Sequence, residues 1–210
     1  MTSTPDTLRY HLVAIGSGPA GRGAAVQAAK LGRRAAVVER EAVLGGVSTN
    51  TGTLPSKTLR AAILELTGQA HGVYGSTHRL RQEITIDDLL WRTRQVIEHE
   101  RELIHDQLRR SGVDVLAGTA SFVHAHTLEI RSAPESRRVE ADHFVIAVGT
   151  RPARTAGVDF DCGTVFDSDG ILQLGRVPRT LTVIGGGVIG PRVRIHGGRA
   201  RRAGHRRGEA

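Results

Sequence analysis

The chain has 210 residues, a formal net charge of +8 and a single cysteine, and 39% of its residues are hydrophobic. That length and composition fit a folded protein with one substantial core, or one domain and part of a second. The single cysteine excludes an internal disulfide and an intramolecular dithiol relay. No apolar run approaches the roughly 18 residues that a membrane span needs, so the sequence predicts a cytoplasmic protein that does not enter a membrane.

The positive charge is concentrated in one short segment. Residues 191–210 carry seven arginines and one acidic residue, a balance of +6. The other 190 residues carry 22 basic and 20 acidic groups, so this part of the chain is nearly neutral. The distribution gives no basic face for nucleic acid. A nucleic-acid-associated protein that uses the basic tail to neutralise phosphates stays a remote alternative.

The first predicted elements form a β-α-β unit. An apolar run at residues 10–15 enters the motif GSGPAG, a helix of small residues follows from Pro19 to Leu31, and residues 35–39 form a second strand that ends in an acid. This is the order of a parallel sheet with a crossover helix. A further helix is predicted from Pro55 to Gly68, before a polar surface excursion.

The later elements continue the alternation of helices and strands, which predicts a mainly parallel α/β sheet. In chain order they are a long helix from Asp87 to Arg110, short strands at 113–116, 119–123 and 126–131, a turn near Pro134, an apolar strand from Phe144 to Val148, a short helix near 168–174 and a buried strand from Thr180 to Ile184.

The first glycine motif predicts a dinucleotide site. Gly16, Gly18 and Gly21 form G-x-G-x-x-G after a strand and open a helix, so they allow a tight turn, close approach of a pyrophosphate and close helix packing. The helix N-terminus offers N–H groups to phosphates. Glu39, at the end of the second strand, can accept hydrogen bonds from ribose hydroxyls. An acid there favours FAD or NAD over NADP.

A second glycine motif predicts a second nucleotide domain. Gly185, Gly187 and Gly190 repeat the pattern after the last predicted strand. The sequence from Pro191 shows neither the helix nor the strand that such a domain needs next.

Four motifs carry a resemblance to a known family: IGSGPAG (15–21), GG…TGTLPSK (45–57), AVGTRPA (147–153) and VIGGGVIG (183–190). Through them the chain resembles the FAD-dependent pyridine nucleotide-disulfide oxidoreductase family over residues 9–190. Within the family it is most similar to the soluble, Si-specific transhydrogenase subgroup, through AAVQAAKLG (24–32), TNTGTLPSKTLR (49–60) and FDSDGIL (166–172). The resemblance implies a Rossmann-like FAD-binding domain with a parallel sheet and a small β-meander over residues 1–150. Residues 151–190 would begin a second Rossmann domain that binds NAD(P).

The resemblance also implies FAD and NAD(P) as cofactors and gives roles to individual residues. The expected cofactor-binding residues are Gly16, Gly18, Pro19, Ala20, Gly21 and Glu39 for the ADP half, Gly45, Gly46, Ser56 and Lys57 for the flavin, Gly118 and Ala120 for the adenine side, Gly149 at a strand end, and Gly185, Gly187 and Gly190 for NAD(P). Lys57 would be the catalytic residue, near the reactive flavin nitrogen; the alternative is a solvated helix lysine. No metal site is expected, because His124 and His126 lack a third ligand nearby.

The loop LGGVSTNTGTLPSK (44–57) narrows the expected reaction. The resemblance implies two redox cysteines at the positions that Ser48 and Thr53 occupy. A hydroxyl is neither a soft nucleophile nor reversibly oxidised, so disulfide reduction is a poor candidate. The expected activity is NAD(P)+ transhydrogenation, in which NADPH and NAD+ exchange hydride through FAD. The alternatives are a non-catalytic FAD-binding fragment and a diaphorase like dihydrolipoamide dehydrogenase.

Residues 191–210 depart from the family. The resemblance implies Glu-Tyr-Ala-Ser after the second motif. If residues 192–197, Arg-Val-Arg-Ile-His-Gly, were encoded CGA GTA CGC ATC CAC GGC, the same bases read one position later would give that tetrapeptide. The tail is therefore predicted to be a frameshift product, and the chain an N-terminal part of a parent that is a homodimer. Such a chain would expose apolar edges, aggregate readily, retain FAD weakly and be inactive.

Overall fold

The computed structural model describes residues 7–66, 85–160, 162–176 and 178–190. The predicted surface excursion at 68–84 and the predicted frameshifted tail at 191–210 lie outside these residues. The chain divides into two units, and each is described by itself. Unit 1 comprises residues 1–50 and 99–151, and unit 2 comprises residues 51–98 and 152–210.

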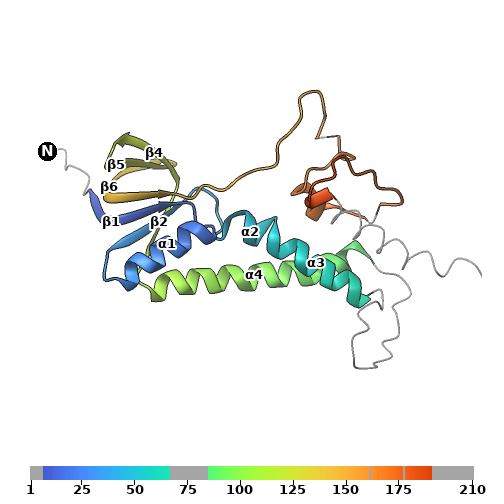
Figure 1. Ribbon diagram of the computed structural model, residues 1–210, viewed down its shortest axis with the longest axis horizontal. Helices are drawn as coiled ribbons and strands as arrows, with labels where there is room; N and C mark the ends of the chain where they lie inside the picture. The colour runs from blue at the N-terminus through green and yellow to red at the C-terminus, as the bar shows by residue number, and fades with distance from the viewer. Residues whose placement is uncertain (1–6, 67–84, 161, 177, 191–210) are drawn as a thin grey trace, which may run out of the picture. The chain divides into compact units, whose positions relative to one another are not determined.

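Unit 1 is built on a six-stranded sheet of order β3-β2-β1-β6-β5-β4 (Figure 1). The first four strands in this order are parallel, and β5 and β4 extend the sheet as an antiparallel meander. The strands are β1 (Leu8–Ile15), β2 (Ala35–Glu39), β3 (Asp114–Ala117), β4 (Thr119–His124), β5 (Thr127–Ser132) and β6 (Glu135–Ile146). The predicted mixed α/β, mainly parallel architecture with a small meander is therefore confirmed.

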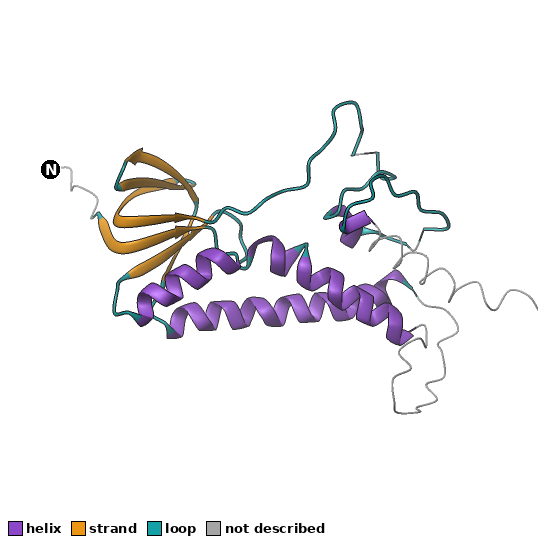
Figure 2. Cartoon of the chain, in the orientation of Figure 1, coloured by secondary structure: helices purple, strands orange, loops and turns teal. Residues whose placement is uncertain are grey.

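Two apolar clusters hold the sheet of unit 1. On one face, α1 (Pro19–Lys30) and the last part of α4 (Ile86–Arg110) pack against β1 and β2, as Figure 2 shows for α1. Small residues of α1, such as Ala25, allow this close approach, and Ile104 and Leu108 of α4 complete the cluster. On the other face, side chains of β1 to β3 pack against those of β5 and β6. The carboxyl ends of the parallel strands are thus fixed from both sides.

The predicted elements and the structure differ in three places. The strand predicted from Phe144 begins earlier in the structure, where β6 starts at Glu135. A short helix, α2 (Gly46–Asn50), precedes α3 (Thr53–Leu66). Residues 180–184, expected to be a buried strand, form no strand.

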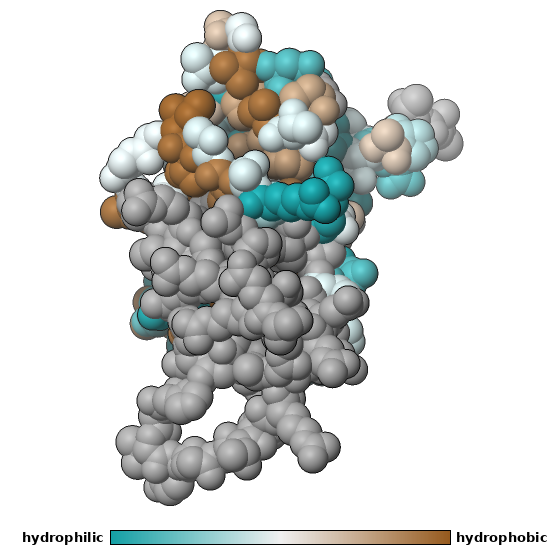
Figure 3. All heavy atoms as spheres, turned by 90° about the vertical axis from the view of Figure 1, so that its right-hand side faces the viewer, coloured by the Kyte–Doolittle hydropathy of each residue, from teal (hydrophilic) through white to brown (hydrophobic). Residues whose placement is uncertain are grey.

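Unit 2 explains the third difference. A strand needs a neighbour to pair its backbone groups, and no strand occurs among the described residues of unit 2. Between residues 152 and 188 the regular element is the short 3-10 helix η1 (Gly170–Gln173). Apolar side chains that a paired strand would bury stay exposed, and Ile184 is 97% exposed. Apolar surface is visible as brown atoms in Figure 3.

In unit 1, Tyr10 belongs to a polar cluster near the amino ends of the parallel strands β1 and β3. The Tyr10 hydroxyl donates to Asp114 Oδ2 at 2.8 Å, and the Arg34 guanidinium lies 4.7 Å from the centre of the Tyr10 ring. Arg34 also pairs with Asp114 at 3.7 Å. Burial, followed by the hydrogen bond and charge of Asp114, raises the pKa of Tyr10 to about 12, although Arg34 opposes the shift.

We expect this raised pKa to make the stability of unit 1 fall in alkaline solution. The phenol ionises near pH 10 in the unfolded chain and near 12 in the folded chain, so the free energy of unfolding falls as pH rises between these values. Tyr10→Phe should cost about 0.5–1.5 kcal/mol at pH 8, and this difference from wild type should shrink toward pH 12. Urea unfolding followed by circular dichroism measures both; a difference that stays constant with pH contradicts the expectation.

Candidate functional site

The carboxyl ends of the parallel strands meet at one edge of unit 1. Backbone hydrogen bonds extend past these ends, from Gly16 N to Val38 O (2.8 Å), from Gly118 N to Glu39 O (2.8 Å) and from Ala147 N to Ile15 O (2.9 Å). Ligands of open α/β sheets bind at this kind of edge. The structure therefore brings together the first glycine motif, Glu39 and Gly118.

The three glycines of the first motif differ in why the structure requires a residue without a side chain. Gly16 has a φ of +107°, and a Cβ on it would meet the Ala147 carbonyl. A Cβ on Gly21 would meet the Gly16 carbonyl oxygen. Gly18, the N-cap of α1, has extended backbone, and a Cβ on it would meet nothing within 4 Å. Gly16 and Gly21 are thus required by the turn itself, whereas Gly18 leaves open space.

The open space lies at the N-terminus of α1. Pro19 and Ala20 begin the 12-residue helix, and no side chain caps its first N–H groups. The first N–H groups of a helix have no partner within it and attract anions. Gly46 lies beside this turn, because a Cβ on Gly46 would come within 3.2 Å of Gly18 Cα. The backbone of two glycines, Gly18 and Gly46, therefore lies at this helix N-terminus.

Glu39 is a buried carboxylate, 8% exposed, at the end of β2. Its Oε2 accepts hydrogen bonds from Ser17 N (3.0 Å) and Ser17 Oγ (2.5 Å), and its Oε1 accepts one from Glu41 N (3.1 Å). Burial alone raises the pKa of Glu39, but hydrogen bonds from the Ser17 side chain and from backbone N–H groups outweigh it and hold the pKa below its ordinary value. Glu39 is therefore charged at neutral pH and anchors the turn.

The loop at residues 44–46 is held in an unusual conformation. Gly45 and Gly46 both have positive φ, +104° and +59°. The Gly45 N–H donates to Ser17 Oγ at 2.9 Å, and Asn50 Nδ2 donates to Leu44 O (3.1 Å) and Gly46 O (2.9 Å). We call residues 44–46 the glycine loop.

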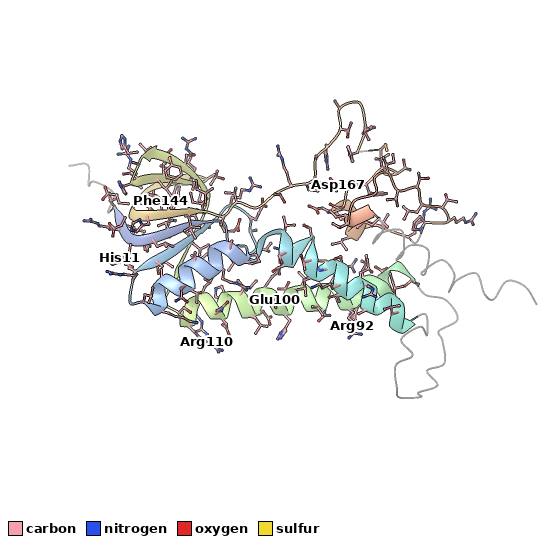
Figure 4. All side chains as sticks on the ribbon, in the orientation of Figure 1. His11, Arg92, Glu100, Arg110, Phe144 and Asp167 are labelled. Carbon is pink, nitrogen blue, oxygen red and sulfur yellow. The ribbon has the colours of Figure 1, made fainter. Side chains whose placement is uncertain are left out.

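The helix α4 supports the glycine loop from its other side. Arg101 Nε donates to Asn50 Oδ1 at 2.8 Å. Glu100, labelled in Figure 4, pairs with Arg22 of α1 at 3.8 Å. This support could not be predicted from local sequence patterns, because Asn50 and Arg101 are 51 positions apart.

Two of the four predicted flavin residues belong to unit 2. Ser56 and the exposed Lys57 lie on α3, where Ser56 N donates to Gly52 O (3.1 Å) and Ser56 Oγ donates to Thr53 O (3.2 Å). The structure does not place them relative to unit 1, so their role stays a prediction. Thr51 Oγ1 is buried, and the described residues offer it no hydrogen-bond partner.

The remaining predicted residues of unit 1 are Gly118, Ala120 and Gly149. Gly118 has a φ of +138°, and a Cβ on it would lie 2.6 Å from Arg131 O. Ala120 packs partly buried against the core, and Gly149, with a φ of +67°, is exposed. Gly118 is thus required for the turn between β3 and β4, beside Glu39.

The second glycine motif repeats the local turn of the first. Gly185 has the same φ of +107° as Gly16, and a Cβ on Gly190 would lie 2.5 Å from Gly185 O. A Cβ on Gly185, however, would meet nothing within 4 Å. Gly187 is likewise open. The turn forms without the strand that was expected before it.

Among the described residues no group of three or more His, Cys, Asp or Glu side chains is arranged to hold a metal ion, and His126 Nδ1 lies 3.0 Å from Ala141 O. No described helix is long and apolar enough to cross a membrane.

Comparison with known proteins gives consistent results. The profile of the family described as "Pyridine nucleotide-disulphide oxidoreductase" matches residues 10–195. A soluble pyridine nucleotide transhydrogenase of Mycobacterium tuberculosis is 49% identical over 86% of this chain and 39% of its own length. The one of Photobacterium profundum is 37% identical over 90% of this chain and 41% of its own length. This chain therefore spans about two fifths of the length of these relatives.

A solved structure shows the same similarity. The Cu(II) complex of the HOCl-induced flavoprotein disulfide reductase RclA from Escherichia coli matches with a TM-score of 0.77 and 26% identity, over 91% of this chain and 40% of that one. Together with the profile match, this similarity implies FAD and NAD(P) as cofactors, as the sequence predicted.

We expect Glu39→Gln to destabilise unit 1 at neutral pH and to matter less in acid. A glutamine presents an N–H₂ group where the carboxylate accepts, which leaves a buried donor without a partner at a cost of about 1–3 kcal/mol. The lowered pKa of Glu39 means that its stabilisation is present above pH 4.5 and is lost as pH falls through the folded-state value. Unfolding free energies at pH 7 and pH 3 test this, with the exposed Glu41→Gln as control. An equal effect of both variants at pH 7 contradicts the expectation.

Proposed function

The chain belongs to the pyridine nucleotide-disulphide oxidoreductase family, and on this premise we propose that it holds FAD at the glycine-rich edge of unit 1 for hydride exchange between NADPH and NAD+. One observation carries the choice of reaction. The positions of the two redox cysteines implied by the sequence resemblance hold Ser48 and Thr53, and the one cysteine, Cys162, is exposed in a loop. Hydroxyl groups cannot form a reducible disulfide.

The residues at the edge of unit 1 fit the ADP half of FAD. The uncapped start of α1 and the open space at Gly18 suit a pyrophosphate, which needs N–H donors and close approach of the backbone. Gly16 and Gly21 shape the turn. Glu39 is charged and lies at the strand end where a ribose would bind, although its carboxylate already accepts three hydrogen bonds from the protein.

On the flavin side, the proposal gives roles to four further residues. Gly45 and Gly46 would lie along the flavin, and Ser56 and Lys57 would contact it, with Lys57 near the reactive nitrogen. The buried, unpartnered hydroxyl of Thr51 is consistent with a missing polar partner in this loop. When bound, FAD supplies the ring that accepts and donates hydride. The protein positions that ring and offers no thiol that would divert the electrons.

The larger assignments follow from the same premise. Residues 1–150 would form the FAD-binding domain and residues 151–190 the start of the NAD(P)-binding domain, with Gly185, Gly187 and Gly190 at its phosphate turn. The activity is proposed for the protein of full family length, as a homodimer in the cytoplasm, since relatives carrying the name "soluble" span more than twice the matched segment.

The proposed phosphate position predicts unequal effects of two glycine substitutions. Gly18→Ala adds a Cβ to open space, so the folded chain should keep its stability, but the methyl group occupies the place where the pyrophosphate approaches. FAD affinity should fall about tenfold or more. Fluorescence titration with FAD measures this.

Gly23→Ala is the matched control. Gly23 is an exposed glycine of α1 whose Cβ would also meet nothing within 4 Å. FAD affinity should stay unchanged, and stability should rise by about 0.5–1 kcal/mol because alanine favours helix. Equal FAD affinities of the two variants would place the phosphates elsewhere.

The proposed reaction is tested in a chimera. Residues 1–190 are joined to the part of the Mycobacterium tuberculosis relative that lies beyond the match, and the intact relative serves as control. With flavin absorbance confirming a loaded protein, we expect NADPH to reduce thio-NAD+ and to reduce neither oxidised lipoamide nor glutathione disulfide. A flavin-loaded chimera that reduces a disulfide, or that transfers no hydride to thio-NAD+, contradicts the proposal.

A further inference from the structure

Ser17, inside the first glycine motif, has a side chain that no predicted role uses. It is fully buried, with 0% exposure, and its hydroxyl contacts two segments that are distant in sequence. Oγ lies 2.5 Å from Glu39 Oε2, 22 residues away, and 2.9 Å from Gly45 N, 28 residues away. It is thus the point where the end of β2, the glycine loop and the turn at residues 16–21, which we call the phosphate turn, meet.

The direction of these hydrogen bonds is fixed by chemistry. A charged carboxylate can only accept, so the Ser17 hydroxyl donates its one hydrogen to Glu39. A lone pair of the same oxygen then accepts the Gly45 N–H. Donation to a charged group makes the hydroxyl oxygen a better acceptor, because bonds in such a chain polarise one another. The strength of the bond to Gly45 therefore depends on how firmly Glu39 and Ser17 are held.

Among the described residues, two side chains bond the backbone of the glycine loop, one from nearby in sequence and one from a distant segment. Asn50 holds the carbonyls of Leu44 and Gly46 from within the same stretch of chain. Ser17, in the phosphate turn, accepts the hydrogen bond of the Gly45 N–H between them. Since Gly45 and Gly46 both have positive φ, the loop depends on such attachments to keep its conformation.

We propose that Ser17 is a positioning residue that couples the two ends of the cofactor site: a nucleotide bound at the phosphate turn stabilises the glycine loop through the Ser17 hydroxyl. The inference rests on the proposed FAD site. A ligand at the turn restrains the backbone of residues 16–21 and excludes water from Glu39. Both effects make breaking the bond between Ser17 and Gly45 more costly. By linkage, a loop ordered by the flavin end strengthens binding at the turn by the same factor.

The test uses ADP, which has no flavin and therefore cannot touch the loop through that ring. Amide hydrogen exchange of the whole chain, followed by NMR, reports Gly45 and residues 16–21 separately. In wild type, saturating ADP should slow exchange of the Gly45 amide by about fivefold or more, the lower range of ordinary coupling. In Ser17→Ala, ADP should still bind the turn, but Gly45 exchange should be fast and insensitive to ADP.

Asn50→Ala is the matched control, because it loosens the same loop without cutting the connection. Gly45 exchange should be faster than in wild type without ligand, yet ADP should still slow it. If the Ser17 side chain only filled space, the Gly45 amide would respond to ADP in the same way in Ser17→Ala and in Asn50→Ala. If Ser17→Ala does not fold, Ser17→Cys retains a side chain with a weak donor and acceptor, and its Gly45 amide should show little or no response to ADP.

The outcomes separate this inference from the proposed function. An ADP response of Gly45 in Ser17→Ala that equals the wild-type response overturns the coupling and leaves the nucleotide site intact. Absence of any ADP effect on residues 16–21 in wild type overturns the proposed site itself. Binding at the turn without an effect on Gly45 in wild type overturns the coupling alone.

Discussion

The site of unit 1 depends on a carboxylate buried at the end of β2. A buried charge must be matched by hydrogen-bond donors, and Glu39 obtains them from Ser17 and from the backbone of Glu41. This requirement fixes the phosphate turn next to the strand end. Through the Ser17 hydroxyl it also fixes the glycine loop. One charge thus organises three segments that form the proposed cofactor site.

Comparing the two glycine motifs separates the local determinants of the turn from the tertiary contacts that position it. Both turns have the same φ at the first glycine, and in both the last glycine lies against the first one's carbonyl. Only Gly16 is also pressed against a neighbouring strand end, at Ala147. The glycines therefore suffice to form the turn, while the sheet determines where it stands. In the described part of unit 2 no strand gives the second motif that setting.

The sequence predicted the elements whose periodicity is strong, such as the β-α-β unit and α4. It missed the first part of β6, because Val139 and Ala141 are the only fully buried side chains of that strand. It expected a strand at 180–184 from apolar content alone, but apolar residues do not make a strand without a partner. The role of Ser17 could not be foreseen, because its partners lie 22 and 28 residues away.

The central claim is that unit 1 binds the ADP half of a dinucleotide at Gly16 to Gly21 beside Glu39. Equilibrium dialysis of the purified chain against FAD, with and without excess ADP, tests it most directly. We expect saturable binding of one FAD per chain that ADP displaces. FAD binding that does not saturate, or that excess ADP leaves unchanged, would contradict the account.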